Sequence, residues 1–345
     1  MKKRAFFRLA AVLAAMCLLA GCAADAAPDG ADFAPAQEQR LVVYTSHKKE
    51  VWWPIVKEFE ERTGIWVDVV TGGTNELLER ISWEADAPCA DVMFGGGVES
   101  LEAYSEYFTP YLCADTADIA PQYRTSDGLW TPFSALPIVL IYNPKLVERT
   151  ELTSWQDLLR PEFCGRIAFA DPAVSGSCYT GLVTMLSAVD APQEDTLRAF
   201  AENLSGKLLS SSGDILDSVA DGTDWVGITL EETALKRIAA GENLRMVYPS
   251  DGTSAVPDGS VLIRGAQHAE NARRFLDFTV SRDVQSLLQD SEFSRRSVRS
   301  DIEPPAVLVR LEKIPMTAYD ISQASSERGA ILERFQALLD GEGEK

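Results

Sequence analysis

The chain has 345 residues, 46% of them hydrophobic, and a formal net charge of −20 at pH 7. That length is more than one hydrophobic core usually serves, so we expect two folded lobes. A strongly acidic surface repels nucleic acid, which excludes it as a partner, and it requires that any bound anion is held by local donors.

Residues 1–21 have the layout of a lipoprotein signal peptide. Four basic residues come first, and the apolar run Leu9–Ala20 that follows is too short to span a bilayer comfortably. The run ends in Leu19-Ala20-Gly21-Cys22, which resembles the bacterial lipobox and implies a lipid anchor on Cys22. An ordinary signal peptide with an incidental cysteine is the alternative. Either way, we expect an exported protein, and the first interpretation adds anchoring at the extracytoplasmic face of the membrane.

Residues 22–40 are rich in Ala, Asp, Pro and Gln and lack a periodic apolar pattern, so we expect a flexible tether. The folded body then begins near Leu41. Loss of residues 1–21 removes four basic and no acidic residues and takes the net charge from −20 to −24.

Four cysteines remain in the expected body. In an oxidising compartment an even number of cysteines indicates disulfides. The pairing of sequence neighbours, one bridge in each lobe, is our expectation among three possible pairings: Cys89 with Cys113, and Cys164 with Cys178. Neither CxxC spacing nor adjacent histidines favour a metal site.

Strands and helices alternate from residue 41 onward. Short apolar strands are expected at 41–44, 65–70 and 90–94, each followed by a helix, at 50–63, 75–85 and 98–108. This alternation predicts an α/β fold with a parallel sheet covered on both faces. Ligands of such sheets bind in the loops after the carboxyl ends of the strands.

Residues 134–142 are apolar and contain Pro137, which favours a crossover between lobes. We expect lobe 1 to hold residues 41–135 plus about 250–300, and lobe 2 to hold residues 136–249 plus about 301–345. A second alternation predicts strands at 166–170, 225–230, 244–248 and 260–263, and helical segments at 155–159, 177–189, 196–203, 231–240, 269–279, 283–288 and 330–339.

Five segments resemble the extracellular solute-binding proteins of ABC importers: Leu41 to Lys48, the helix end Phe59 to Gly64, Gly72 to Leu77, Ala90 to Gly97, and Asp171 to Thr180. The most similar branch contains ferric-iron binders and relatives that bind hexose phosphates, phosphonates, thiamine or polyamines. The resemblance implies the type II periplasmic-binding-protein fold, with two α/β lobes, a hinge and a ligand cleft between the lobes. It also implies a monomeric binding protein that is not an enzyme, needs no cofactor and delivers its solute to permease subunits.

The C-terminal half looks like the members associated with sugar-phosphate uptake, on residues 226–232 and 248–259. Ferric binders of this family usually show adjacent tyrosines where this chain has Ile228 to Thr233, and no tyrosine lies there. Phenolate oxygens suit a hard trivalent cation. We therefore expect a small anionic solute, preferably a sugar phosphate or another organic phosphate. Ferric iron is the alternative, with His47 and Glu76 as possible ligands in that case alone.

Most of the candidate ligand-binding residues follow the expected strands or open the expected helices. Hydroxyls and backbone N–H groups at helix N-termini suit an oxyanion, although the same residues also serve as helix caps. A carboxylate at Glu231 would accept hydrogen bonds from sugar hydroxyls. The candidates are Ser46, His47, Thr74, Asn75, Gly96, Ser175, Gly176, Ser177, Ser212, Glu231, Asp251 and Thr253.

One enzyme pattern is present. Ser46-His47-Lys48-Lys49 fits the S-x-x-K pattern of serine acylases, but the companion motifs S-D-N and K-T-G are absent from the chain. We therefore assign no catalytic residue.

Overall fold

The computed structural model describes residues 35–148, 152–289 and 294–341. The chain divides into an N-terminal unit, residues 1–39, and a folded unit, residues 40–345. The expected signal peptide, Cys22 and most of the expected tether lie outside the described residues. None of the helices in the described ranges has the length and apolar character needed to cross a membrane.

Ten strands of the described chain form one sheet: β1 Arg40–Thr45, β2 Trp66–Thr71, β3 Val92–Gly97, β4 Phe108–Thr109, β5 Thr131–Tyr142, β6 Ile167–Ala168, β7 Val226–Leu230, β8 Arg245–Val247, β9 Ala255–Ile263 and β10 Arg296–Ser297. Their order is β2-β1-β3-β9-β5-β7-β6, with β4 paired to β9 and with β8 and β10 paired to β5. β1 pairs in parallel with β2 and β3, but β9 is antiparallel to both β3 and β5. The expected parallel sheet is thus mixed, because β9 enters the sheet from the opposite direction.

β5 crosses from one part of the sheet to the other. It pairs with β9 as far as Pro137, and from Ile138 onward it pairs with β7. Proline has no N–H to donate, so the ladder changes partner where the backbone has no donor to lose. We call lobe 1 the part with β1, β2, β3, β4, β9, β10 and the start of β5, and lobe 2 the part with β6, β7, β8 and the end of β5.

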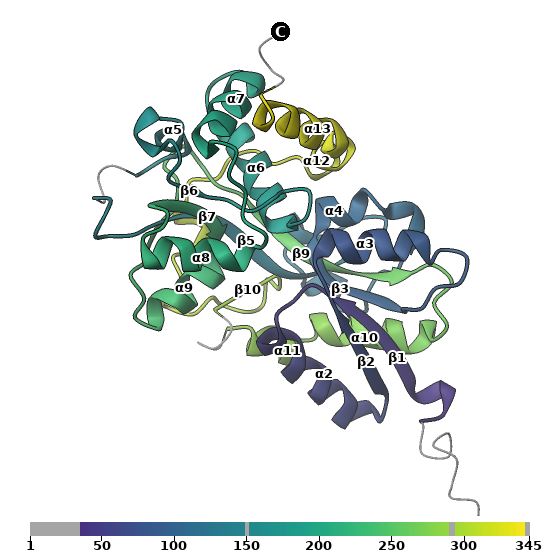
Figure 1. Cartoon of the computed structure of the whole chain (residues 1–345). Coiled ribbons are helices and arrows are strands. Elements are labelled where there is room, and N and C mark those ends of the chain that lie inside the picture. The colour runs from purple at the N-terminus through teal and green to yellow at the C-terminus, as the bar shows by residue number, and fades with distance from the viewer. Residues whose placement is uncertain (1–34, 149–151, 290–293, 342–345) are drawn as a thin grey trace, which may run out of the picture. The chain divides into compact units, whose positions relative to one another are not determined.

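The helices of the described chain cover this sheet (Figure 1): α2 Lys49–Thr63, α3 Thr74–Trp83, α4 Val98–Glu102, α5 Trp155–Leu158, α6 Gly176–Ala188, α7 Gln193–Leu204, α8 Ser212–Asp221, α9 Glu231–Ala239, α10 Ala269–Val280, α11 Arg282–Leu287, α12 Ile321–Ser326 and α13 Arg328–Leu339. α2 is typical: Val51, Ile55 and Phe59 face the core at helical spacing, and Gly64 ends the helix in the left-handed conformation.

Several segments differ from their sequence-based expectations, and two of them show why. The helix expected over residues 98–108 ends at Glu102, because Phe108 and Thr109 leave it and pair with β9 as β4. α8 was not expected as a helix; Ser211 caps it and Gly222 ends it. Both differences come from local capping and strand pairing, which apolar periodicity does not report.

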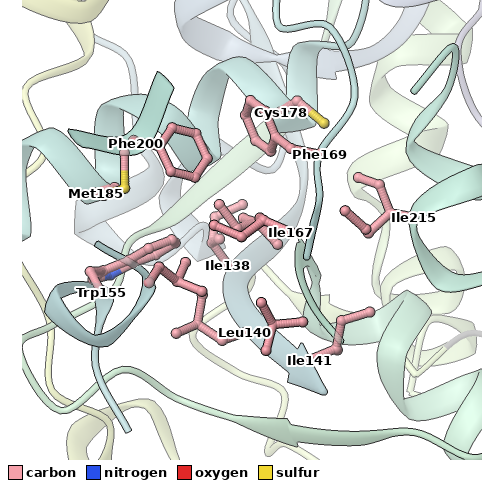
Figure 2. Close-up of a cluster of buried hydrophobic side chains, with 14 of the residues drawn as sticks. Ile138, Leu140, Ile141, Trp155, Ile167, Phe169, Cys178, Met185, Phe200 and Ile215 are labelled. Carbon is pink, nitrogen blue, oxygen red and sulfur yellow. The ribbon is translucent and has the colours of Figure 1, made fainter. Parts of the chain in front are cut away.

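Each lobe has its own hydrophobic core. In lobe 2, side chains from β5, β6, α6 and α7 interlock, among them Ile138, Leu140, Phe169 and Phe200 (Figure 2). In lobe 1, α2 and α10 pack on the sheet through Phe59 and other buried residues. Burying one such side chain contributes roughly 1.5–3 kcal/mol, so each core can hold its lobe rigid.

The C-terminal helices contact both lobes. α12 packs against α4 of lobe 1, and α13 packs against α7 of lobe 2 (Figure 1). The Tyr179 hydroxyl of α6 also donates a 2.5 Å hydrogen bond to the carbonyl of Ala324 in α12. The lobe boundaries expected from the sequence remain a prediction. That prediction places residues 301–345 in lobe 2 and does not include their contacts with lobe 1.

The prediction of two disulfides is wrong. Cys89, Cys113, Cys164 and Cys178 are all free thiols. Cys89 and Cys164 are exposed, whereas Cys113 and Cys178 are buried in hydrophobic clusters. Pairing sequence neighbours would have joined a surface thiol to a core thiol in each lobe.

Candidate functional site

A cavity of about 380 Å³ lies between the two lobes. Lobe 1 contributes loops that follow β1, β2 and β3, and lobe 2 contributes loops that precede α6, α8 and α9. The lining residues are Ser46, His47, Lys48, Gly73, Thr74, Glu76, Gly96, Gly97, Leu136, Val174, Ser175, Gly176, Ser177, Thr180, Ser210, Ser211, Ser212, Thr229, Leu230, Glu232, Thr233, Val256, Pro257, Asp258 and Arg295.

Helix N-termini converge on this cavity. The N-cap residues of α2, α3, α6, α8 and α9 all line it: Lys48, Gly73, Ser175, Ser211 and Leu230. Each helix N-terminus carries roughly half a positive charge and presents backbone N–H groups. The cavity therefore has five sources of positive potential for an anion, from both lobes.

Serine hydroxyls reinforce the N-termini of α6 and α8. Ser175 Oγ accepts a hydrogen bond from the Cys178 amide at 3.4 Å and lies 3.2 Å from Ser177 Oγ. Ser211 caps α8 in the same way, through the Asp214 amide at 3.4 Å. Ser175 and Ser211 are therefore caps as well as lining residues, while Ser177 has its neighbour Ser175 as its hydroxyl partner.

Two glycines bring the end of β3 close to the other loops of lobe 1. Gly95 and Gly96 have φ angles of 103° and 111°, a region that residues with a side chain rarely adopt. A Cβ atom on Gly96 would lie 2.9 Å from Thr74 Cγ2, and one on Gly95 would lie 2.9 Å from His47 Nε2. The triple glycine thus allows three loops to meet at the cavity.

A buried charged group lies on the lobe 1 side of the cavity. Arg295 Nη1 donates to Asp258 Oδ2 at 2.7 Å and to Ser134 Oγ at 2.9 Å, and its Nη2 donates to Glu232 Oε1 at 3.2 Å. Ser134 and Asp258 belong to β5 and β9 on the lobe 1 side, whereas Glu232 opens α9 in lobe 2. Arg295 therefore joins the lobes through charge-assisted hydrogen bonds.

The titration of two neighbouring groups follows from this burial. Desolvation first, then the charges of Arg295 and Lys236, lower the pKa of His47 well below its usual value. His47 is consequently neutral at pH 7, and its 3.5 Å contact with Asp258 is not an ion pair. Burial acts to raise the pKa of Glu232, but Arg295 and Lys236 hold that pKa below its usual range, so Glu232 is ionised.

Eight of the twelve candidate residues line the cavity: Ser46, His47, Thr74, Gly96, Ser175, Gly176, Ser177 and Ser212. Asn75 is buried beside it, and its Nδ2 donates to the Ala173 carbonyl at 2.5 Å. That bond joins α3 of lobe 1 to the loop before α6 in lobe 2, so the two lobes are in contact. The ligand contacts themselves remain a prediction for all twelve.

Three candidates have structural partners that account for them and do not line the cavity. Glu231 forms a two-pronged buried ion pair with Arg296, with both contacts at 2.7 Å. Asp251 accepts from the backbone amides of Trp155 and Gln156 at the start of α5. Thr253 is fully buried and donates to the Ile138 carbonyl at 2.6 Å.

Several lining residues were not among the candidates, notably Lys48, Thr180, Glu232, Asp258 and Arg295. Lys48 and Glu232 each adjoin a candidate, so the right loops were chosen at the wrong residue. Asp258 lies within a strand and Arg295 follows a segment without a recognisable motif. No sequence pattern we used would have found these last two.

The residues named for the iron alternative both line the cavity. His47 is 8% exposed, and Glu76 accepts a 3.1 Å hydrogen bond from the Gly73 amide with one carboxylate oxygen. Within the described ranges, no group of three or more His, Cys, Asp or Glu side chains is arranged to hold a metal ion.

Comparisons with known proteins define the class. The chain belongs to the bacterial extracellular solute-binding protein family, whose model matches residues 90–316. It is 26% identical over 276 residues to iron uptake protein A1 of Synechocystis sp., which covers 75% of this chain and 76% of the relative. It is 27% identical over 255 residues to a putative 2-aminoethylphosphonate-binding periplasmic protein of Salmonella typhimurium, covering 71% and 73%.

Among solved structures, the chain resembles the periplasmic binding protein AfuA from Actinobacillus pleuropneumoniae with fructose-6-phosphate bound. The TM-score is 0.79 at 22% identity, over 87% of this chain and 98% of that chain. This likeness confirms the expected two-lobed α/β fold. The protein is thus an exported solute-binding protein, and the relatives leave its solute open.

Proposed function

We propose that this protein captures a small organic phosphate, preferably a sugar phosphate, and delivers it to the permease of an ABC importer. The observation that carries the proposal is the convergence of five helix N-caps, three from lobe 2 and two from lobe 1, on a single cavity. A phosphate group offers several anionic oxygens, which several N-termini can share.

An anion site in this acidic protein depends on helix N-termini and hydroxyls, because the charged side chains of the cavity lining have no positive excess. Lys48 and Arg295 add positive charge at the cavity, and Arg295 is already balanced by Asp258 and Glu232. Each helix N-terminus contributes roughly 0.3–2 kcal/mol to holding an anion, depending on burial. Together with serine hydroxyls, these donors offset the repulsion from a net charge of −20.

The remaining lining suits an organic portion that carries hydroxyls or an amine. Glu76, Glu232 and Asp258 supply carboxylate oxygens, which accept hydrogen bonds from either group. Leu136 and Val256 supply apolar surface. The fructose-6-phosphate complex of AfuA and the aminoethylphosphonate-binding name of the Salmonella relative support an organic phosphate or phosphonate.

Delivery of the solute depends on closure of the two lobes. A solute that contacts both lobes stabilises their closed arrangement. The permease then recognises the closed protein, a monomer with the solute enclosed. We further propose that lipid on Cys22 holds the protein at the extracytoplasmic face of the membrane, and that binding involves no enzymatic turnover.

Isothermal titration tests the proposal with fructose 6-phosphate, 2-aminoethylphosphonate, inorganic phosphate and ferric citrate. We expect at least one organic phosphate or phosphonate to bind in the micromolar range or tighter. Ser177→Ala should weaken that binding by roughly tenfold to a hundredfold, because a hydrogen bond to a charged group contributes about 1.5–3 kcal/mol.

Ser326→Ala is the matched control, since Ser326 is exposed on α12 and bonds within its own helix. It should bind as the wild type does. No binding heat with any of the phosphorus compounds would contradict the proposal. Binding of ferric citrate alone, with an absorption band lost on chelation, would favour the iron alternative. Two observations support that alternative: the iron uptake relative, and the positions of His47 and Glu76 at the cavity.

A further inference from the structure

A carboxylate is buried where the two lobes meet. Glu99 of α4 in lobe 1 has no exposed surface, and its Oε1 accepts a short hydrogen bond from the Thr180 hydroxyl of α6 in lobe 2. Thr180 also lines the cavity. The contact therefore joins the lobes at the edge of the solute site.

No cation is in direct contact with this carboxylate. Among the described residues, no Lys, Arg or His forms an ion pair with Glu99, although the charge of Arg328 acts on it from farther away. Its buried Oε2 has only an uncharged hydrogen-bonding neighbour, the Tyr319 hydroxyl. The ionisable groups around it are Glu102 on its own helix, Tyr179 on α6, Tyr319 in the segment before α12, and Arg328 at the start of α13. At neutral pH the two tyrosines are uncharged and the charges of Glu102 and Arg328 oppose each other, so burial has the largest effect on the pKa of Glu99.

Burial accordingly raises the pKa of Glu99 to about 6, against the opposing hydrogen bond from Thr180. Separation of the lobes would break that bond and admit water to the carboxylate, which would return the pKa toward its ordinary value of about 4.5. The closed arrangement therefore holds this proton more tightly than the open one.

We propose that closing the lobes takes up a proton at Glu99, so that the protein closes, and binds its solute, more readily in mildly acidic than in neutral solution. This inference rests on the proposed capture of a solute between the lobes. The sign follows from linkage: the stabilisation of the closed form is complete below the lower pKa and is lost as pH rises through the higher one. Between pH 7.5 and pH 5.0 these two values give roughly an eightfold change in the closure equilibrium.

Three other buried titrating groups line the cavity. The pKa of His47 and that of Glu232 are lowered, whereas burial raises the pKa of Asp258 against the charge of Arg295. The effects of these three groups, and the titration of the solute's own phosphate, are present equally in the wild type and in a Glu99 variant. Comparing the two proteins isolates the contribution of Glu99.

The chain offers a natural pair of positions for measuring closure. Cys89 in lobe 1 and Cys164 in lobe 2 are exposed free thiols, while Cys113 and Cys178 are buried. Spin labels on the exposed pair, in a protein with Cys22→Ser, report the distance between lobes by pulsed electron resonance. This measurement needs no solute, so its failure is distinct from a failure of the proposed function.

For the wild type we expect the closed population to grow relative to the open one by roughly eightfold from pH 7.5 to pH 5.0. Glu99→Gln, which mimics the protonated acid, should lose this response of roughly eightfold and keep only the response of the groups that the two proteins share. Glu106→Gln removes an exposed charge from the turn Ser105–Tyr107 just after α4 and should keep the wild-type response. With fructose 6-phosphate, the affinity should follow the same pattern.

A wild-type distance distribution that does not move with pH, or a Glu99→Gln protein that moves as the wild type does, would overturn the inference. Failure of fructose 6-phosphate and the other phosphorus compounds to bind, with the distance still responding at Glu99, would instead count against the proposed solute alone.

Discussion

The pair formed by Glu231 and Arg296 is buried, with both side chains at most 4% exposed. Removing one partner leaves an uncompensated charge, whereas replacing both together costs far less. We predict that Glu231→Gln lowers the free energy of unfolding by about 3–5 kcal/mol. The double variant Glu231→Gln with Arg296→Met should recover most of that loss in urea denaturation.

Binding separates this structural role from a ligand role. Once folded, the double variant should bind its solute with wild-type affinity, because Glu231 lies off the cavity. A double variant that is as stable as the wild type but binds at least tenfold more weakly would return Glu231 to the binding site.

The four thiols give a second prediction at this scale. Cys89 and Cys164 are exposed, and burial raises the pKa of Cys178 to about 11. Reactivity follows thiolate content and access. Two thiols of the body should therefore react promptly with a disulfide reagent in native protein and four should react in denaturant. Four unreactive cysteines in denaturant without reductant would restore the disulfide prediction.

Individual site residues were predictable where one rule sufficed. Ser46, Thr74 and Ser175 follow strands or open helices, and the carboxyl ends of strands face the cavity. Glu231 was chosen in place of Glu232 because one residue turns a side chain by about 100° around a helix, a difference that the pattern of residues does not fix. Arg295 reaches the site only through the three-dimensional packing of distant segments.

At the scale of elements, alternation of apolar runs was enough to locate most strands and helices, but not strand direction. β9 and β3 are antiparallel because of where the chain returns, which no local pattern records. The close packing of α8 on β7 depends on a single missing side chain. A Cβ on Gly227 would lie 2.8 Å from Ile215 Cγ2 and 3.3 Å from the Ala168 carbonyl oxygen.

We predict that Gly227→Ala destabilises the protein by about 1–3 kcal/mol, since overpacking forces neighbours apart. Gly329→Ala is the matched control, because Gly329 lies in α13 with no atom within 4 Å of the added Cβ. It should be neutral or slightly stabilising, as alanine favours helix. Equal thermal unfolding temperatures of the two variants would contradict this prediction, because they would show that α8 and β7 move apart without loss of stability.

At the scale of the whole molecule, the two lobes, the strand β5 that joins them and the cavity form one connected structure. β5 runs from one lobe to the other, and Asn75, Glu99 and Arg295 each form a hydrogen bond that spans the lobes. We propose that the solute completes the interface, so that binding and closure are one equilibrium. In this proposal the ligand preference comes from the helix N-termini at the cavity and not from the acidic surface.

The most direct test of this account is a crystal structure of the protein with the organic phosphate or phosphonate that binds best in titration. The account predicts phosphorus-bound oxygens within hydrogen-bond distance of Ser177 and of the first backbone amides of helices from both lobes. A phosphorus group held outside this cavity, or held by one lobe alone with the lobes apart, would contradict it.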